Sequence, residues 1–247
     1  MASQPLLAPT RIGSELEEQF VHVAENLVRV HNTSSADREF GLVFPKCRGT
    51  DDLRVCEQEA KILFLHRVLS SARYRVAVEK PTSRDYGFSG TGRRSAQTDV
   101  ALYETGHDTQ ALIEFKADNR DTGICKDLEK LIREEQLGAW FHTLAAADRG
   151  TLHSLAQKFK TSFVALCHHL DDAVPHDCLF AFCIVRNKIL LSRWLPLGGH
   201  DALATVEEAF DTLALDSPLW RPRSFSATTP TCALPDLVVE PSECDAG

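Results

Sequence analysis

The stretch from residue 97 to residue 117, QTDVALYETGHDTQALIEFKA, decides the expected fold because it reads as two β-strands joined by a turn. The apolar segments QTDVALY (97–103) and ALIEFKA (111–117) are short and bounded by polar residues, as strands are. Between them, Gly106-His107-Asp108 supplies the residue types that favour a turn. The stretch therefore predicts two adjacent strands of one sheet.

The ionisable side chains of these two strands are expected on one face of the sheet. Side chains alternate across a strand, so Glu114 and Lys116 share the face opposite to Phe115, and Asp99 lies opposite to Val100. Adjacent strands can then bring Asp99, Glu114 and Lys116 together. Burying ionisable groups costs free energy unless they are paired or bind a metal. Two carboxylates are the hard oxygen ligands that magnesium prefers.

Further helices and strands are expected on both sides of this hairpin, within one α/β domain over residues 14–223. Residues 1–13 and the acidic, Pro- and Ser-rich residues 224–247 are expected to be flexible tails. The other expected elements are a helix from Ser14 to about residue 30, a helix over about 52–71, a strand over 74–79, a loop over 80–96, a helix over about 124–135, a strand over 138–144, a helix over about 151–170, a hairpin of 179–185 with 189–194, and a helix over 201–215.

The composition is that of an ordinary globular protein. The 247 residues are 43% hydrophobic and 25% charged, which argues against a disordered or fibrous chain. No apolar run of about 18 residues is present, and the N-terminus lacks the pattern of a signal peptide, so a cytoplasmic protein without membrane contact is expected. The net charge of −8 argues against indiscriminate coating of nucleic acid but allows a local basic patch.

From residue 52 the expected order is helix, three strands, helix, strand, with an acidic residue on the second strand and Glu-x-Lys on the third. This arrangement resembles the PD-(D/E)XK nuclease superfamily, which has the restriction endonuclease-like fold. Asp99 matches the first signature position, and Glu114-Phe115-Lys116 matches the second. The resemblance covers about residues 52–145. It implies an αβββαβ core with a mixed sheet flanked by helices, to which this chain adds an N-terminal helix and a C-terminal hairpin and helix.

Many members of the superfamily also carry a Glu on the first core helix. Glu59 is the best match because it lies on the expected buried stripe of that helix, and Glu57 is the second choice. The proline that often precedes the signature Asp is replaced by Thr98, a change that is frequent in the superfamily.

The resemblance implies a role for each matched residue. Asp99, Glu114 and the carbonyl of Phe115 would bind Mg²⁺, for which Mn²⁺ could substitute. Lys116 would position or activate the attacking water, and Glu59 would hold a second metal ion or its water. The competing interpretation is a pair of strands held together by salt bridges in some other α/β domain.

A basic window precedes Asp99. Residues 66–98 contain seven Arg or Lys and two acidic residues, which suits a polyanionic substrate. Arg84, Arg93 and Arg94 are the candidate substrate-binding residues of this window, although a solvated loop explains them equally well. The helix after Glu-x-Lys adds Lys126 and Lys130, which lie one turn apart and could contact a phosphate. An exposed charged face is the alternative for these two lysines.

Two functions from different classes follow. The first is a magnesium-dependent endonuclease that hydrolyses phosphodiester bonds, with DNA favoured over RNA, a homodimer as one form, and a role in prokaryotic defence or restriction suggested by the resemblance. The second is a catalytically inactive protein that keeps the nuclease fold to bind nucleic acid or a protein partner.

A zinc site is a weaker alternative for the region after residue 166. It would draw on one loose cluster, whereas zinc sites normally use two closely spaced ligand pairs. The candidate ligands are Cys167, His168, His169, His176 and Cys178.

Overall fold

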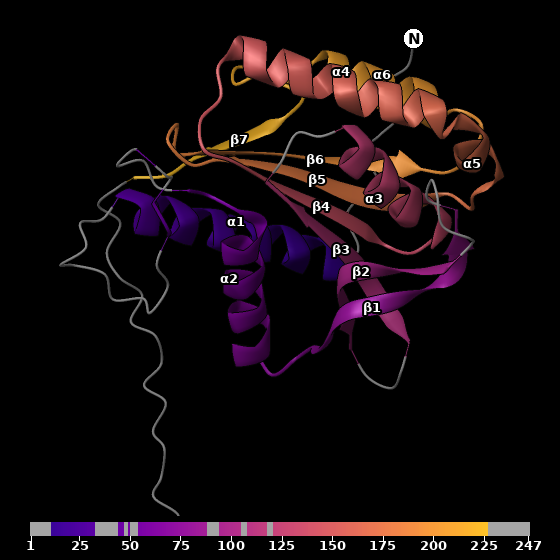
Figure 1. Ribbon diagram of the computed structural model, residues 1–247, viewed down its shortest axis with the longest axis horizontal. Coiled ribbons are helices and arrows are strands. Elements are labelled where there is room, and N and C mark those ends of the chain that lie inside the picture. Colours follow the sequence, from indigo (N-terminus) through magenta and orange to yellow (C-terminus); the bar gives the residue numbers. More distant parts are fainter. Residues whose placement is uncertain are drawn as a thin grey trace, which may run out of the picture.

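The computed structural model describes residues 11–32, 44–46, 49, 54–87, 94–104, 108–117 and 121–226. These residues form an α/β fold in which one mixed, seven-stranded sheet lies between two layers of helices (Figure 1). The strands are β1 (Arg75–Tyr86), β2 (Arg94–Tyr103), β3 (Thr109–Lys116), β4 (Gly138–Leu144), β5 (His176–Ile184), β6 (Ile189–Leu197) and β7 (Arg221–Ser224). The helices are α1 (Arg11–Asn32), α2 (Glu57–Ser70), α3 (Asp121–Arg133), α4 (Arg149–Ala165), α5 (Cys167–Asp172) and α6 (Ala202–Asp211).

The strands are arranged in the sheet in their chain order, β1 to β7. The pairs β3–β4 and β4–β5 are parallel, with α3 connecting the first pair and α4 and α5 the second, and the remaining pairs are antiparallel. The expected α/β class and mixed sheet are confirmed. The order α2-β1-β2-β3-α3-β4 is also the order that the sequence predicted over residues 52–145.

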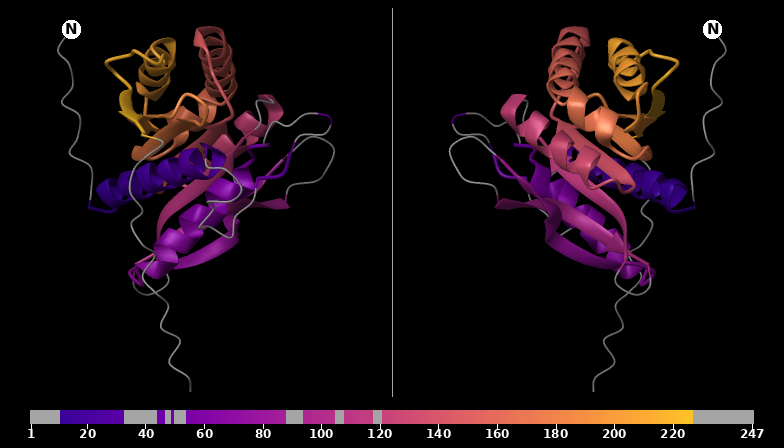
Figure 2. Two further views of the ribbon diagram at one scale, coloured as in Figure 1. Left: turned by 90° about the vertical axis from the view of Figure 1, so that its left-hand side faces the viewer. Right: turned by 90° about the vertical axis from the view of Figure 1, so that its right-hand side faces the viewer.

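Each face of the sheet carries its own core. Helices α3 to α6 cover one face, where Leu128, Trp140 and Phe159 are buried, and α1 and α2 cover the other. Figure 2 shows the sheet twisting between these two helix layers. On the second face, the Phe20 ring of α1 packs against Phe115 and Phe141 at ring-centroid distances of 6.3 and 4.9 Å. These contacts fix the centre of β3, the strand that carries Glu-x-Lys.

Several boundaries differ from the expectation. Helix α1 begins at Arg11 rather than at Ser14, because Arg11 pairs with Glu15 one turn later and Ile12 packs against the core. The expected helix over 151–170 is divided into α4 and α5 at Leu166. The chain also continues in the sheet through Ser224, where the backbone amide of Phe225 donates to the carbonyl of Lys188. Residues 1–10 and 227–247, in which most of the expected tails fall, lie outside the described residues.

The largest difference concerns the expected loop over 80–96. Strand β1 continues to Tyr86 and β2 begins at Arg94, with an irregular register between Pro81 and Asp85. Side chains replace the missing ladder bonds there, since the Thr82 hydroxyl accepts a hydrogen bond from the Ala96 amide at 2.9 Å.

No helix of the described residues is long and apolar enough to cross a membrane.

Candidate active site

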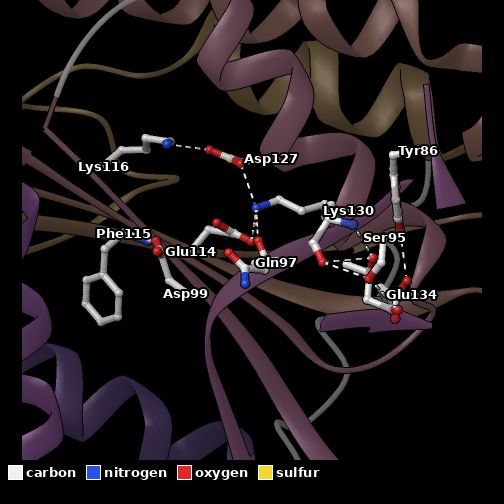
Figure 3. A network of polar contacts seen from close by, with 12 residues as sticks. Tyr86, Ser95, Gln97, Asp99, Glu114, Phe115, Lys116, Asp127, Lys130 and Glu134 are labelled. Carbon is white, nitrogen blue, oxygen red and sulfur yellow. Dashed lines mark hydrogen bonds and ion pairs between the residues drawn. The ribbon is translucent and has the colours of Figure 1, made fainter. Parts of the chain in front are cut away.

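The alternation of β2 and β3 places the signature residues on one face of the sheet. Val100, Ile113 and Phe115 belong to the core under α1 and α2. Asp99 and Glu114 therefore lie on the opposite face, which α3 covers, and Lys116 follows on the same face (Figure 3). Because Val100 pairs with Ile113, the preceding Asp99 comes opposite Glu114 where the two strands leave their ladder. Asp99, Glu114 and Lys116 thus lie at the same end of the β2–β3 pair, where Glu114 and Lys116 contact charged groups of α3 and the Asp99 carboxylate contacts Lys61 of α2.

Asp99 is held by two donors on different elements. Its Oδ2 accepts a hydrogen bond from the Phe115 backbone amide at 2.8 Å, which replaces a ladder bond at this end of the β2–β3 pair. Its Oδ1 lies 3.1 Å from Nζ of Lys61, which reaches it from α2. The Asp99 side chain remains 26% exposed, so this carboxylate forms the open side of the site.

Glu114 is the innermost group of the site, with a side chain that is 1% exposed. Its Oε1 lies 2.6 Å from Nζ of Lys130 on α3. Burial, and then the neighbouring Asp127 carboxylate, raises the pKa of Glu114 well above its usual value, whereas the Lys130 ammonium acts in the opposite direction. The carboxyl group of Glu114 thus has little contact with solvent and depends on α3 for its counter-charge.

Helix α3 supplies two further charged groups, Asp127 and Lys130, which lie one turn apart. Nζ of Lys130 lies 2.7 Å from Asp127 Oδ1 and donates to the Gln97 carbonyl at 2.7 Å. Asp127 Oδ2 lies 2.5 Å from Nζ of Lys116. Burial acts to lower the pKa of both lysines, but the nearby carboxylates outweigh it, so the pKa of Lys116 and the pKa of Lys130 are raised.

The site therefore combines two sets of paired charges drawn from four elements, the Lys61–Asp99 pair and the chain of contacts Lys116–Asp127–Lys130–Glu114. It contains three carboxyl groups and three lysines among the described residues, and each carboxyl group contacts at least one lysine. The members are Lys61 of α2, Asp99 of β2, Glu114 and Lys116 of β3, and Asp127 and Lys130 of α3. Such pairing is what makes buried charges tolerable. We call this set the charge network.

Sequence reasoning missed Lys61 and Asp127 as members of the charge network. Asp127 stands between Lys126 and Lys130, and its i,i+3 spacing to Lys130 is the sequence signal of this pair. Lys61 is buried among apolar residues of α2, which is itself an indication that this lysine has a specific acidic partner.

Glu59 is directed to the start of its own helix rather than to the charge network. Its Oε2 accepts from the Cys56 amide at 3.1 Å and from the Cys56 thiol at 2.6 Å, which forms the capping box of α2. Glu57, the second choice from the sequence, lies close enough to Lys116 to contribute to its raised pKa. The first turn of α2 thus approaches the network through Glu57.

The candidate substrate-binding residues are dispersed. Arg84 forms an ion pair with Glu135 at 3.2 Å on the surface, and Lys126 is exposed on α3. Lys130, in contrast, is buried within the charge network. Arg93 and the side chain of Arg94 lie outside the described residues.

The segment near Arg84 is tied to the end of α3 by Glu134. The Glu134 carboxylate accepts hydrogen bonds from the backbone amides of Ser83 and Arg84, at 2.9 and 3.3 Å, and from the Tyr86 hydroxyl at 2.9 Å. Tyr86 is fully buried, and the guanidinium of Arg133 lies 4.5 Å from its ring centroid. Figure 3 shows the contact between Tyr86 and Glu134 beside Lys130.

The donor chemistry of the site fits magnesium. Asp99, Glu114 and Asp127 offer the carboxylate oxygens that Mg²⁺ prefers. In the observed arrangement lysine ammonium groups neutralise them, and within the described ranges no set of three or more His, Cys, Asp or Glu side chains is arranged to hold a metal ion. This finding covers the proposed zinc cluster as well, where His176 Nε2 lies 3.0 Å from the Leu131 carbonyl oxygen.

Comparisons with protein-family models, curated proteins and solved structures give no match to this chain.

The exposure of its charged side chains determines which groups of the site a ligand can reach. Asp99 and Lys116 are partly exposed, with side chains that are 26% and 19% accessible, while Glu114 and Asp127 lie behind them. Asp99 and Lys116 are therefore the members of the charge network that solvent reaches most.

Proposed function

We propose that the protein is a magnesium-dependent phosphodiesterase of the PD-(D/E)XK type that acts on nucleic acid, with DNA as the first substrate to test. The observation that carries the proposal is the placement of Asp99 beside Glu114 on adjacent strands, with Lys116 following on the same face. The element order α2-β1-β2-β3-α3-β4 supports it, because it is the order of the αβββαβ core that the resemblance implies.

Each residue has a definite task in this proposal. Asp99, Glu114 and the Phe115 carbonyl would hold Mg²⁺, which when bound supplies Lewis-acid polarisation of the scissile phosphodiester. Lys116 orients the attacking water and meets the charge that develops on the phosphate. Asp127 holds the Lys116 ammonium in place from α3. The water oxygen bonds to phosphorus as one ester P–O bond breaks, which leaves a phosphomonoester and a free hydroxyl group.

The test is incubation of the protein with single- and double-stranded DNA and RNA in magnesium, manganese or EDTA. We expect cleavage with magnesium or manganese, and none in EDTA. Glu114→Gln should be inactive, whereas Glu208→Gln, the same change at an exposed position of α6, should cleave like the wild type. Activity that persists in Glu114→Gln, or the absence of cleavage under every condition, would contradict the proposal.

One observation favours a second candidate, a non-catalytic binding protein with the same fold. The three carboxyl groups of the charge network already contact lysines, as in a purely structural network. Binding of nucleic acid without cleavage, unchanged by magnesium or by Glu114→Gln, is the result that this candidate predicts.

A further inference from the structure

Lys130 is the lysine of the charge network that contacts both buried carboxyl groups, Glu114 and Asp127. Its ammonium group lies 2.6 Å from Glu114 Oε1, 2.7 Å from Asp127 Oδ1 and 2.7 Å from the Gln97 carbonyl oxygen. These oxygens come from β3, α3 and β2, and the Lys130 side chain is 5% exposed. Lys130 donates a hydrogen bond to the Gln97 carbonyl and meets the Glu114 and Asp127 carboxyl groups as ion pairs.

The same oxygens are ligands of the kind that a divalent cation requires. Glu114 is the deepest carboxyl group of the site, and its Oε1 contacts Lys130. Mg²⁺ and the Lys130 ammonium would be two positive groups beside Glu114 in a poorly solvated place, which is costly unless the lysine withdraws. Lys130 can release Glu114 and still keep Asp127 and the Gln97 carbonyl, so the required movement is local.

We propose that Lys130 is an internal competitor of the divalent cation, so that a metal ion binds only when the Lys130 ammonium releases Glu114. The inference rests on the proposed metal-dependent function and adds to it a residue that sets the metal affinity. Lys130 then has a role different from the phosphate contact expected from the sequence: it occupies the position beside Glu114 until a metal ion arrives.

Helix α3 offers a matched control. Lys126 lies one turn before Lys130 and carries the same charge, but its side chain is exposed and Lys130 is buried. Lys126→Gln therefore removes one positive charge from the same helix without changing the contacts of Glu114. Lys130→Arg is a second control, because it keeps a cation beside Glu114 and Asp127.

The experiment is calorimetric titration of the four proteins with Mg²⁺ and with Mn²⁺ in the absence of substrate. Lys130→Gln should bind the metal at least about tenfold more tightly than the wild type, since a metal ion no longer has to displace the ammonium. Lys126→Gln and Lys130→Arg should remain close to the wild type. Equal or weaker binding by Lys130→Gln overturns the inference.

Thermal unfolding in EDTA and in magnesium supplies a readout that a merely structural lysine would not change. Lys130→Gln should unfold at a lower temperature than the wild type in EDTA, and magnesium should raise its Tm by more than it raises that of the wild type. A lower Tm that magnesium does not restore overturns the inference. If Lys130→Gln does not fold in EDTA, refolding in magnesium decides: folding supports the inference and failure to fold overturns it.

The titrations also separate the inference from the proposed function. Metal binding by Lys130→Gln but not by the wild type supports competition and contradicts a wild-type metal enzyme. Equal binding by both proteins retains the metal enzyme and overturns competition. Binding by neither protein overturns both.

Discussion

The Lys116 ammonium lies 2.5 Å from Oδ2 of Asp127, so the last residue of β3 is fixed to the middle of α3. The lysine of the Glu-x-Lys segment is therefore oriented by a helix that follows it in the chain. Because Asp127 also contacts Lys130, the two lysines share one carboxylate. Variants of these residues distinguish a catalytic arrangement from a structural one.

Lys116→Ala should lower the rate of phosphodiester cleavage by about two to three orders of magnitude, because it removes a preorganised positive charge that acts in the transition state. Asp127 keeps Lys130 as a partner, so the fold and the magnesium affinity should be largely retained. Single-turnover cleavage, magnesium titration and thermal unfolding measure the three effects. Cleavage at the wild-type rate, or a variant that does not fold, would defeat the catalytic assignment of Lys116.

Asp127→Asn should destabilise the protein by about 3–5 kcal/mol, since it leaves two lysines without their common counter-charge in a buried site. Urea unfolding measures this free energy. Glu129→Gln is the matched control on the same helix, where the carboxylate pairs with Arg133 nearer the surface, and it should cost about 1 kcal/mol or less. Equal losses in the two variants would show that Asp127 has no special place in the network.

The stability of the wild type should contain a component that falls as pH rises above the ordinary pKa of 4.5 for Glu114. The pKa of Glu114 is raised in the folded state by burial and by Asp127, so the folded protein binds more protons there than the unfolded chain does. The stabilisation is complete below the unfolded pKa and is lost as pH rises through the folded pKa. Glu114→Gln cannot titrate, so urea unfolding between pH 5 and 8 should show this component only in the wild type.

Glu134→Ala should destabilise the protein by about 1–3 kcal/mol, because the backbone amides of Ser83 and Arg84 and the Tyr86 hydroxyl lose their acceptor. Hydrogen exchange should become faster at Ser83 and Arg84 in particular. Glu135→Ala removes the adjacent surface partner of Arg84 and should change the exchange rates much less. Unchanged protection in Glu134→Ala would show that other contacts hold this segment.

The spacing of residues along the chain predicted which strand side chains belong to the site. It did not predict which helix side chains belong to it. The two-residue alternation of β2 and β3 determines that Asp99 and Glu114 share a face, whatever the rest of the fold. Which helix side chains reach that face depends on where α2 and α3 cross the sheet, a tertiary property. The direction of the Glu59 side chain and the participation of Lys61 and Asp127 could therefore not be predicted, although the helices that carry them were expected.

The length of β1 was missed for a different reason. Pro81 lacks a backbone donor, and the residues after it are polar, which reads as a loop. In the fold, Thr82 and Glu134 supply the hydrogen bonds that a regular ladder would have given. No local pattern in the sequence indicates that distant side chains will supply these hydrogen bonds.

The irregular register between Pro81 and Asp85 also bears on how copies of the protein behave in concentrated solution. Strand β1 lies at the edge of the sheet, where a long, regular strand would invite another chain to pair with it. The irregular register and the exposed charges of Glu79 and Arg84 interrupt that template. The irregular register thus also protects the 12-residue strand β1 from edge-to-edge pairing with other copies, which would lead to aggregation.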